Sequence, residues 1–265
     1  MMNKEQPWLL VVGGQPRSGT SMLWAICNSH PAIHLSFEFR NFIRLGKSYE
    51  DNLARLRKSW WKWDLAGKRH AAPKAMRKAY STVFLARYLR KFRRFSGETI
   101  RANHVREVLA ELWSGYRIVG DKFPPYVHRL HNLVRHDRMY RVVIYRDCRD
   151  VVQSTLLKAG TSWKDKHFAQ NLNTPEKVAK RWVKAIEKME KFSTDIHAIR
   201  YEELVIEPRP VLGRLAAYLH VDQALFDHNI VRPTSIGKFE HGLSSEQLEP
   251  IMDIAGPTLT RLGYL

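Results

Sequence analysis

The stretch that most constrains this chain is an apolar run leading into a glycine loop. Residues 8–12, WLLVV, precede GGQPRSGTS at 13–21, and the helical pattern TSMLWAICNSH occupies 20–30. A short apolar run that ends in glycines is typical of a buried parallel strand, and the segment after the loop predicts a helix that stops before Pro31. The first elements are therefore predicted to be a strand, a glycine loop and a helix.

The spacing of this loop resembles that of a nucleotide-kinase phosphate loop with its lysine missing. Four residues separate Gly14 from Gly19, and Thr20-Ser21 stands where Lys and Ser/Thr are expected. Backbone N–H groups at a helix N-terminus still bind an anion without that lysine, and Arg17 supplies positive charge inside the loop. The loop predicts an anion site, and a P-loop nucleotide kinase is one alternative function.

The rest of the chain alternates between apolar strand patterns and helical patterns. The predicted strands are 116–121, 140–146 and 195–201, and the predicted helices are 126–137, 149–159, 174–192, 208–219 and a last one with a Ser244/Gln247 capping box. This alternation predicts an α/β fold in three layers, with a central parallel sheet flanked by helices on both faces. Ligands of such sheets bind at the carboxyl ends of the strands.

A basic region at about 44–114 interrupts the alternation and predicts a helical insert. Aromatic residues recur there at every fourth position, at Tyr80, Phe84, Tyr88 and Phe92. One interpretation is a set of helices packed on the core with a solvated basic face. The other is a basic lid or docking surface for an anionic acceptor or a membrane, to which Trp60, Trp61 and Trp63 would contribute aromatic contacts.

The charge of the chain favours a polyanionic partner. The formal net charge is +18, and residues 55–94 hold fourteen Lys or Arg against one acid, Asp64. Nucleic acid, an anionic membrane surface, or an acidic substrate or cofactor would suit such a chain. A basic nucleic-acid-binding module is therefore a second alternative function.

The N-terminal segment and the cysteines favour a cytoplasmic protein, with peripheral contact to a membrane surface left open. The apolar run at 8–12 is too short for a secretion signal or a bilayer span. Cys27 and Cys148 lie far apart without metal-ligand spacing, so each is predicted to be a small buried side chain without a disulfide.

A second phosphate signal lies where the third predicted strand ends, in YRDCRDVVQST at 145–155. Arg146 ends the strand, and Ser154 follows eight residues later, in the second turn of the next helix. Both side chains could reach one phosphate. The alternative is that Arg146 pairs with Asp147 or Asp150 for structural reasons.

Four blocks together resemble the sulfotransferases that use 3′-phosphoadenosine-5′-phosphosulfate (PAPS), particularly the bacterial branch related to tyrosylprotein sulfotransferases. They are PRSGTS with a following HP, YRDCRDVVQS, RYEELVIEP at 200–208, and SIGKFEHGLS with AGPTLTRLGY at 235–264. The resemblance implies a P-loop-like fold and a single sulfotransferase domain over residues 1–265. The blocks are distributed over nearly the whole length of the chain, and the basic insert contains none of them.

The resemblance explains the missing lysine. PAPS has no γ-phosphate, and its anionic ends, a 5′-phosphosulfate and a 3′-phosphate, match the glycine loop and the Arg146/Ser154 pair. The implied cofactor-binding residues are Arg17, Ser18, Gly19, Thr20, Ser21, Arg146, Ser154, Tyr201 and Lys238. The expected product is adenosine 3′,5′-bisphosphate (PAP), and no metal is expected.

Catalysis of sulfuryl transfer needs positively charged side chains that face the transferred sulfuryl group and the leaving oxygen. Arg17 and Lys122 are the candidates, and Lys122 in GDKFP resembles a family lysine that contacts that group. The alternative is that Lys122 is a surface lysine paired with Asp121.

The resemblance also implies a general base for an acceptor hydroxyl. Glu38 lies twenty-one residues after Arg17, where the tyrosylprotein enzymes carry a catalytic glutamate, and Arg40 matches a substrate-binding arginine two residues on. Glu38 could instead be a structural partner of Arg40 or Arg44. His104 is the fallback base.

The acceptor is predicted to carry a hydroxyl group, on a glycan, a lipid-linked molecule or another small molecule. The sequence departs from the tyrosylprotein pattern at Phe37 and Phe39, which predicts an aromatic pocket around the Glu38 carboxylate and makes a peptide tyrosine less favoured. The sequence predicts neither the identity of the acceptor nor the oligomeric state.

Overall fold

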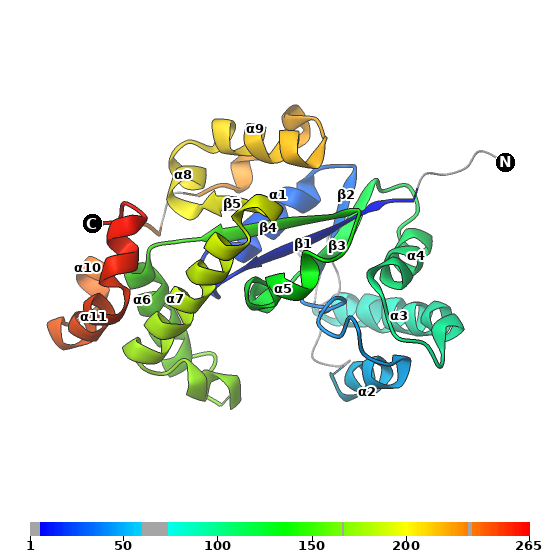
Figure 1. The fold of residues 1–265 in the computed structure, drawn as a ribbon, viewed down its shortest axis with the longest axis horizontal. Helices are drawn as coiled ribbons and strands as arrows, with labels where there is room; N and C mark the ends of the chain where they lie inside the picture. Colours follow the sequence, from blue (N-terminus) through cyan, green and yellow to red (C-terminus); the bar gives the residue numbers. More distant parts are fainter. Residues whose placement is uncertain (1–5, 60–73, 166, 233–234) are drawn as a thin grey trace.

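The computed structural model describes residues 6–59, 74–165, 167–232 and 235–265, which form helices around a five-stranded parallel sheet (Figure 1). The strand order is β2-β3-β1-β4-β5, and the bounds are β1 Trp8–Gly14, β2 Ile33–Phe37, β3 Ile118–Lys122, β4 Met139–Tyr145 and β5 His197–Arg200. The predicted α/β fold with a central parallel sheet is confirmed. Trp60, Trp61 and Trp63 lie outside the described residues.

Strand β1 is the central strand of the sheet, and its pairings set the position of the loops at the carboxyl edge. It pairs with β3 on one side, with Val12 opposite Lys122, and with β4 on the other, with Gly14 opposite Ile144. Five of its seven side chains are apolar, and the second to seventh residues are buried. The loop after β1 therefore emerges between the ends of β3 and β4.

Helices cover both faces of the sheet because the side chains of β1 alternate between two hydrophobic clusters. Leu9 and Val11 pack toward the helical region 44–114, whereas Leu10 and Val12 pack toward α1, α8 and α9. A third cluster joins Val143 of β4 to α6, α7 and α11. The bounds are α1 Thr20–Ser29, α5 Leu130–Leu133, α6 Cys148–Gly160, α7 Pro175–Lys191, α8 Tyr201–Ile206, α9 Pro208–Leu219, α10 Phe239–Gly242 and α11 Ser245–Arg261.

Most predicted helices are confirmed, and their start signals work as expected. The Thr174 side chain caps α7 by accepting a hydrogen bond from the Lys177 N–H, and Ser244 and Gln247 form the capping box of α11. The predicted helix at 126–137 is wrong in extent, because Pro124 and Pro125 open a 3₁₀ segment at Pro124–Arg129 and only α5 follows.

One strand prediction needs correction, and one strand was missed. The strand predicted at 195–201 is shorter, and Tyr201 opens α8 instead of ending β5. Strand β2 was not predicted, because its five residues, IHLSF, include a histidine and a serine that break the apolar run. Both of those polar side chains are buried.

The described residues of the basic insert form three helices, which pack on the sheet. Its helices are α2 Tyr49–Ser59, α3 Lys74–Phe92 and α4 Ala102–Leu112, with a 3₁₀ turn at Arg93–Phe95. Phe84, Tyr88 and Phe92 are buried in the same cluster as Leu9 and Val119, so the interpretation of helices packed on the core is confirmed.

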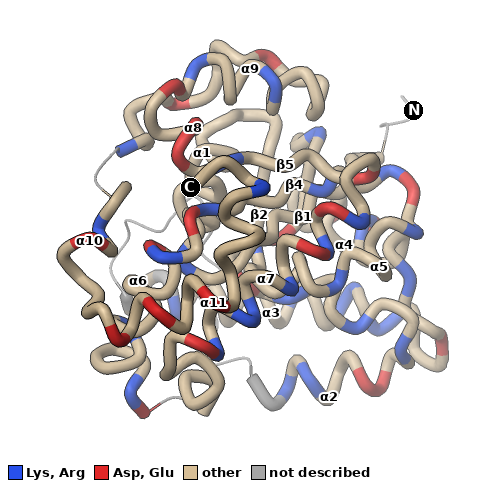
Figure 2. Tube along the Cα trace, turned by 60° about the vertical axis from the view of Figure 1, so that its left-hand side comes forward, with Lys and Arg blue, Asp and Glu red and all other residues tan. Residues whose placement is uncertain are grey.

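The charge of the insert is partly neutralised inside it. Lys91 forms an ion pair with Glu111, and Arg94 forms ion pairs with Glu107 and Glu111, which joins α3 to α4. Figure 2 shows Lys and Arg along α2 and α4 and also along α7, outside the insert. The positive charge is thus spread over the molecule and not confined to one helix.

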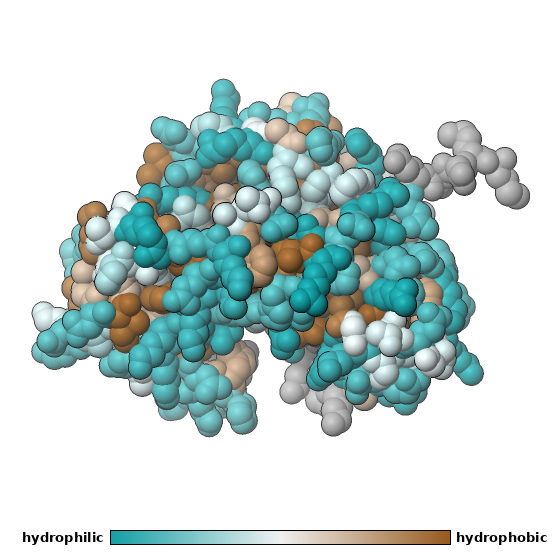
Figure 3. Space-filling model, viewed as in Figure 1, coloured by the Kyte–Doolittle hydropathy of each residue, from teal (hydrophilic) through white to brown (hydrophobic). Residues whose placement is uncertain are grey.

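The surface is mostly hydrophilic in the view of Figure 3. Within the described part of the chain, no helix is both long and apolar enough for a membrane span.

Gly120 of β3 tests the packing of the sheet. A Cβ atom there would lie 1.8 Å from the Leu10 carbonyl oxygen, whereas one at Gly160 in α6 would meet nothing within 4 Å. We expect Gly120→Ala to lower the free energy of unfolding by more than roughly 4 kcal/mol, because β1 and β3 must separate. Gly160→Ala, the matched control, should change it by less than about 1 kcal/mol. Denaturant unfolding measures both, and equal effects would contradict the strand register.

Candidate active site

The glycine loop after β1 requires its glycines. Gly14 and Gly19 have φ angles of 150° and 94°. A Cβ atom on Gly14 would lie 2.3 Å from the Ile144 carbonyl oxygen, and one on Gly19 would lie 2.5 Å from the Tyr201 ring. The loop therefore lies directly against β4 and α8 at the carboxyl edge of the sheet.

The loop ends at the N-terminus of α1, which has features of an anion site. The N–H groups of the first turn of a helix have no intrahelical acceptors. In α1 no side chain caps them, and the first turn holds no acidic residue. Thr20 is buried and Ser21 is exposed within the turn. The positive end of the helix dipole points the same way.

Arg17 joins the loop to the second predicted phosphate motif. Its Nε donates a hydrogen bond of 2.9 Å to Ser154 Oγ in α6, and its carbonyl oxygen accepts one of 3.3 Å from Arg146 Nη1. Burial and, second, the charge of Arg146 lower the pKa of Arg17. Two guanidinium groups and a hydroxyl from segments far apart in sequence thus converge at one place.

Arg146 is buried among several contacts at the end of β4. Its guanidinium forms an ion pair of 2.9 Å with Asp150, donates to the Ser235 carbonyl and lies 4.8 Å from the centroid of the Tyr201 ring. The alternative that Arg146 pairs with Asp150 is therefore observed. The same side chain also contacts the glycine loop, so the structural pair and the predicted site coincide.

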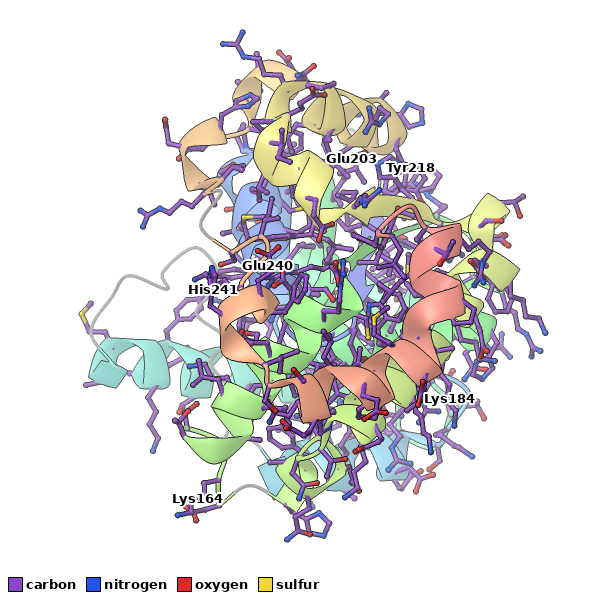
Figure 4. All side chains as sticks on the ribbon, turned by 90° about the vertical axis from the view of Figure 1, so that its left-hand side faces the viewer. Lys164, Lys184, Glu203, Tyr218, Glu240 and His241 are labelled. Carbon is purple, nitrogen blue, oxygen red and sulfur yellow. The ribbon has the colours of Figure 1, made fainter. Side chains whose placement is uncertain are left out.

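Asp150 also fastens the C-terminal segment to this site. Its carboxylate accepts hydrogen bonds from the N–H groups of Gly237 and Phe239, at 3.0 and 3.1 Å. Lys238 lies between these residues with an exposed side chain. Figure 4 shows the next helix, α10, with Glu240 and His241 on the near face of the molecule beside α6.

Several buried polar atoms near the loop have no hydrogen-bond partner among the described residues. They are Ser18 Oγ, Arg146 Nε and both side-chain polar atoms of Gln15. Unpaired buried polar atoms are costly and rare, and they cluster where a polar ligand binds. Their donors suit an anion.

A second group of side chains lies on the other side of β1, at the end of β3. Lys122 is fully buried, and its Nζ donates a hydrogen bond of 2.8 Å to Glu38 Oε1 and lies 3.4 Å from the centroid of the Phe37 ring. Burial lowers the pKa of Lys122, and the neighbouring Glu38 carboxylate opposes that shift. The alternative of Lys122 as a surface lysine is wrong.

Glu38 faces Lys122 and keeps access to solvent. Its side chain is 36% exposed, and its ion-pair partner is Lys122, not Arg40 or Arg44. The predicted aromatic pocket is half right, because Phe37 lies beside the pair while Phe39 is buried. The Phe39 ring packs instead against Phe84 and Tyr88 of α3.

Arg40 and His104 lie at the periphery of this group in different ways. The Arg40 guanidinium lies 4.7 Å from the centroid of the Phe123 ring, next to Lys122 in sequence. The His104 ring stacks on Phe95, and its Nδ1 accepts a hydrogen bond from the N–H of Arg101 at the start of α4. Its Nε2 also lies 3.6 Å from Glu98 Oε2, so the described contacts of His104 join the start of α4 to the segment before it.

The sequence missed the side chains that hold the predicted residues in place. Asp150 was considered only as a partner of Arg146, and its link to the C-terminal segment had no sequence signal. Trp182 of α7 is fully buried and donates a hydrogen bond of 2.8 Å to the Arg146 carbonyl. A tryptophan on the apolar stripe of a helix does not reveal such a role in sequence.

The chain belongs to the Sulfotransferase family, whose profile matches residues 7–225. It is therefore a sulfotransferase. No curated protein gives a significant match.

Solved structures share the fold at low sequence identity. One is a sulfotransferase domain from the curacin biosynthetic pathway, with a TM-score of 0.64 and 16% identity over 97% of this chain and 98% of that one. Another is the sulfotransferase domain of the Synechococcus PCC 7002 olefin synthase, with a TM-score of 0.52 and 16% identity over 93% of this chain and 84% of that one. A third is a sulfotransferase from Mycobacterium avium, with a TM-score of 0.53 and 14% identity over 98% of this chain and 78% of that one. The link to tyrosylprotein enzymes stays a prediction.

The Lys122–Glu38 pair makes a stability prediction. Glu38→Gln should lower the free energy of unfolding by about 1–2 kcal/mol, because it leaves a buried ammonium without its carboxylate; solvent near Glu38 reduces the usual cost of breaking a buried pair. Lys122→Met should change it by less than about 1 kcal/mol, since the remaining carboxylate can be hydrated and the apolar stem is kept. Urea unfolding at neutral pH measures both. A larger loss for Lys122→Met would contradict this asymmetry.

Proposed function

We propose that this protein transfers the sulfuryl group of PAPS to a hydroxyl acceptor and releases PAP. The observation that carries the proposal is the convergence of two anion-binding motifs at one edge of the sheet. Arg17 of the glycine loop contacts Ser154 and Arg146 of the second motif directly. A cofactor with two anionic ends fits two such motifs better than a nucleoside triphosphate does.

The residues at the site fit PAPS in their chemistry. The N-terminus of α1 with Arg17, Ser18, Gly19, Thr20 and Ser21 would hold the 5′-phosphosulfate. Arg146 and Ser154 would hold the 3′-phosphate. The orphaned Ser18 Oγ and Arg146 Nε support this assignment, because each is a buried donor that lacks an acceptor among the described residues.

The two remaining cofactor contacts come from segments that meet at Arg146. The Tyr201 ring lies against both Gly19 and Arg146, so it would lie beside the nucleotide. Lys238 would cover a phosphate from the C-terminal segment, which Asp150 fastens beside Arg146. The described residues contain no cluster of His, Cys, Asp or Glu side chains that could hold a metal ion.

The catalytic roles follow from charge and position. PAPS supplies a sulfuryl group that leaves with its bond to the phosphate oxygen broken. Glu38 takes the proton of the acceptor hydroxyl as the oxygen attacks in line, and its exposed edge leaves room for that acceptor. Lys122 keeps the Glu38 carboxylate in place and, with Arg17, stabilises the negative charge that develops on the leaving oxygen.

The acceptor is a hydroxyl compound that reaches Glu38, and Arg40 is its proposed contact. Two of the similar structures come from the curacin pathway and an olefin synthase, which supports a small-molecule acceptor. A glycan or lipid-linked molecule has the same reactive group, whereas a peptide tyrosine is less favoured. The basic insert is a candidate contact surface for an anionic part of the acceptor or a membrane.

We also propose that residues 1–265 form one catalytic domain in the cytoplasm. The insert shares a hydrophobic cluster with β1 and β3, which supports a single folding unit. Cys27 and Cys148 are both buried and free, which suits a reducing compartment.

Ligand stabilisation tests the cofactor. We expect PAP to raise the Tm without Mg²⁺, by an amount that grows with PAP concentration, because it binds only the folded state. At 100 times its Kd the stabilisation would be about 2.7 kcal/mol. Differential scanning fluorimetry with PAP, ATP and ATP plus Mg²⁺ measures this. Stabilisation by ATP only with Mg²⁺ would support a kinase and overturn the proposal.

Two substitutions should separate catalysis from cofactor binding. Glu38→Gln should lower kcat by about 10²–10⁴-fold, the usual contribution of a general base, while the Kd for PAP stays within twofold. Arg146→Ala should weaken PAP binding by about tenfold or more, since it removes charged hydrogen bonds. Arg214→Ala, which breaks an exposed ion pair with Glu203, is the control. Transfer from labelled PAPS and calorimetry are the measurements.

Equal loss of PAP affinity in both variants would show that Glu38 is misassigned. Binding to nucleic acid that falls steeply with salt, without any transfer from labelled PAPS, would favour the nucleic-acid module instead.

A further inference from the structure

Asp121, the residue before Lys122 on β3, is a fully buried carboxylate with no role in the mechanism above. Four donors surround it. Its Oδ1 accepts hydrogen bonds from Ser36 Oγ at 2.8 Å and the Phe39 N–H at 3.1 Å. Its Oδ2 accepts from the Arg40 N–H at 2.7 Å and the Tyr126 hydroxyl at 2.6 Å. Every short contact of the carboxylate thus comes from a donor.

Two of these donors are backbone N–H groups of one short segment, the loop that follows β2. The Glu38 N–H donates to the Lys122 carbonyl at 2.8 Å, and the next two N–H groups donate to Asp121. The Phe42 N–H donates to the Tyr126 hydroxyl at 3.2 Å, which in turn donates to Asp121. Residues 121–126 therefore hold most of the amides of 38–42.

The backbone of this loop has an unfavourable conformation that depends on contacts with the rest of the protein. Glu38 and Arg40 have φ angles of 57° and 65°, in the left-handed region that non-glycine residues rarely occupy. Such residues cost about 1–3 kcal/mol each and persist only where surrounding contacts determine them. Two of these contacts, from the Phe39 and Arg40 N–H groups, end on the Asp121 carboxylate. The Lys122 carbonyl and the Arg55 guanidinium, which donates to the Phe39 carbonyl at 3.2 Å, add one each.

The conformation of the loop decides where the Glu38 carboxylate lies. Neighbouring residues of a strand point to opposite faces, so Asp121 and Lys122 contact the loop from two sides. Asp121 binds the backbone after Glu38, and Lys122 binds the Glu38 side chain itself. The end of β3 thus holds both the base and the chain that carries it.

We propose that Asp121, assisted by Tyr126, is a positioning residue that sets the location of Glu38 for proton transfer. The proposal rests on the proposed function, in which Glu38 is the base. Asp121 touches neither acceptor nor cofactor in this role, since it is closed off by the loop that it holds.

The charge state of the pair suits this role. Burial raises the pKa of Asp121 to about 6, and the hydrogen bonds from Tyr126, Ser36 and the two amides oppose the shift. Burial and the nearby Asp121 raise the pKa of Tyr126 well above its usual value, so its hydroxyl stays a donor. An ionised Asp121 at neutral pH can accept from all four groups.

The test compares Asp121→Asn and Tyr126→Phe with Glu38→Gln. Asparagine turns one acceptor into an NH₂ group that must face a donor, so we expect kcat to fall about 10–100-fold, as for a catalytic group displaced by about 1 Å. Tyr126→Phe removes one hydrogen bond and should lower kcat about two- to tenfold. The Kd for PAP should stay within twofold in both, because Asp121 and Tyr126 form their hydrogen bonds with β2, with the loop after it and with each other.

A double variant separates positioning from general destabilisation. If Asp121 acts through Glu38, adding Asp121→Asn to Glu38→Gln should lower the residual rate by less than about twofold. Independent effects would multiply instead, and that result would overturn the proposal. Leu215→Ala in α9, a buried residue on the opposite face of the sheet, is the stability control. It should lower the Tm while kcat, measured well below the Tm, stays within twofold.

The outcomes distinguish the two proposals. Full activity of Glu38→Gln would sink the assignment of the base and with it this inference. Loss of activity in Glu38→Gln with full activity in Asp121→Asn and Tyr126→Phe would leave the proposed function standing and overturn the positioning role alone. If Asp121→Asn does not fold, Tyr126→Phe and its double variant with Glu38→Gln decide.

Discussion

Buried charge at the carboxyl edge of the sheet is the constraint on which the rest of the site depends. Among the described residues, the buried Asp, Glu, Lys and Arg side chains are Asp121, Lys122, Arg146, Asp147 and Asp150, all at the ends of β3 and β4 or in the first turn of α6. A buried charge is tolerated only when it is paired and hydrogen-bonded. Asp147 pairs locally with Arg149, whereas the contacts of the other four tie loops to strand ends, so the interactions that make these charges tolerable also build the site.

The pairings divide into two halves on either side of β1, with different chemical abilities. On the β4 side, Arg146 and Asp150 join the glycine loop, α6 and the C-terminal segment around a group of donors suited to an anion. On the β3 side, Lys122 and Asp121 hold Glu38 where solvent can reach it. In the proposed function, cofactor binding and proton transfer would therefore use two different strands, β4 and β3, that both pair with β1.

The structure brings together the residues that the sequence predicted for the β4 half, and the sequence could indicate them because their signals are local. A glycine loop before a helix, or an arginine at a strand end, can be recognised from about ten consecutive residues, and so can a helix cap such as Thr174. It predicted the β3 half only through resemblance. Strand β2 went unrecognised because it is short and contains polar residues, and the partners Glu38 and Lys122 are 84 residues apart. No periodic pattern connects positions at that separation.

The sequence by itself determined that a parallel α/β sheet would present a glycine loop and an arginine-serine motif at one edge, because apolar periodicity and glycine conformations are local properties. Only the tertiary structure decided that Arg17 contacts Ser154, that Lys122 is buried against Glu38, and that Asp121 holds the loop between them. These outcomes depend on the strand order, which sets β3 and β4 on the two sides of β1. Strand order follows from how all the layers pack together, and packing is a property of the whole chain.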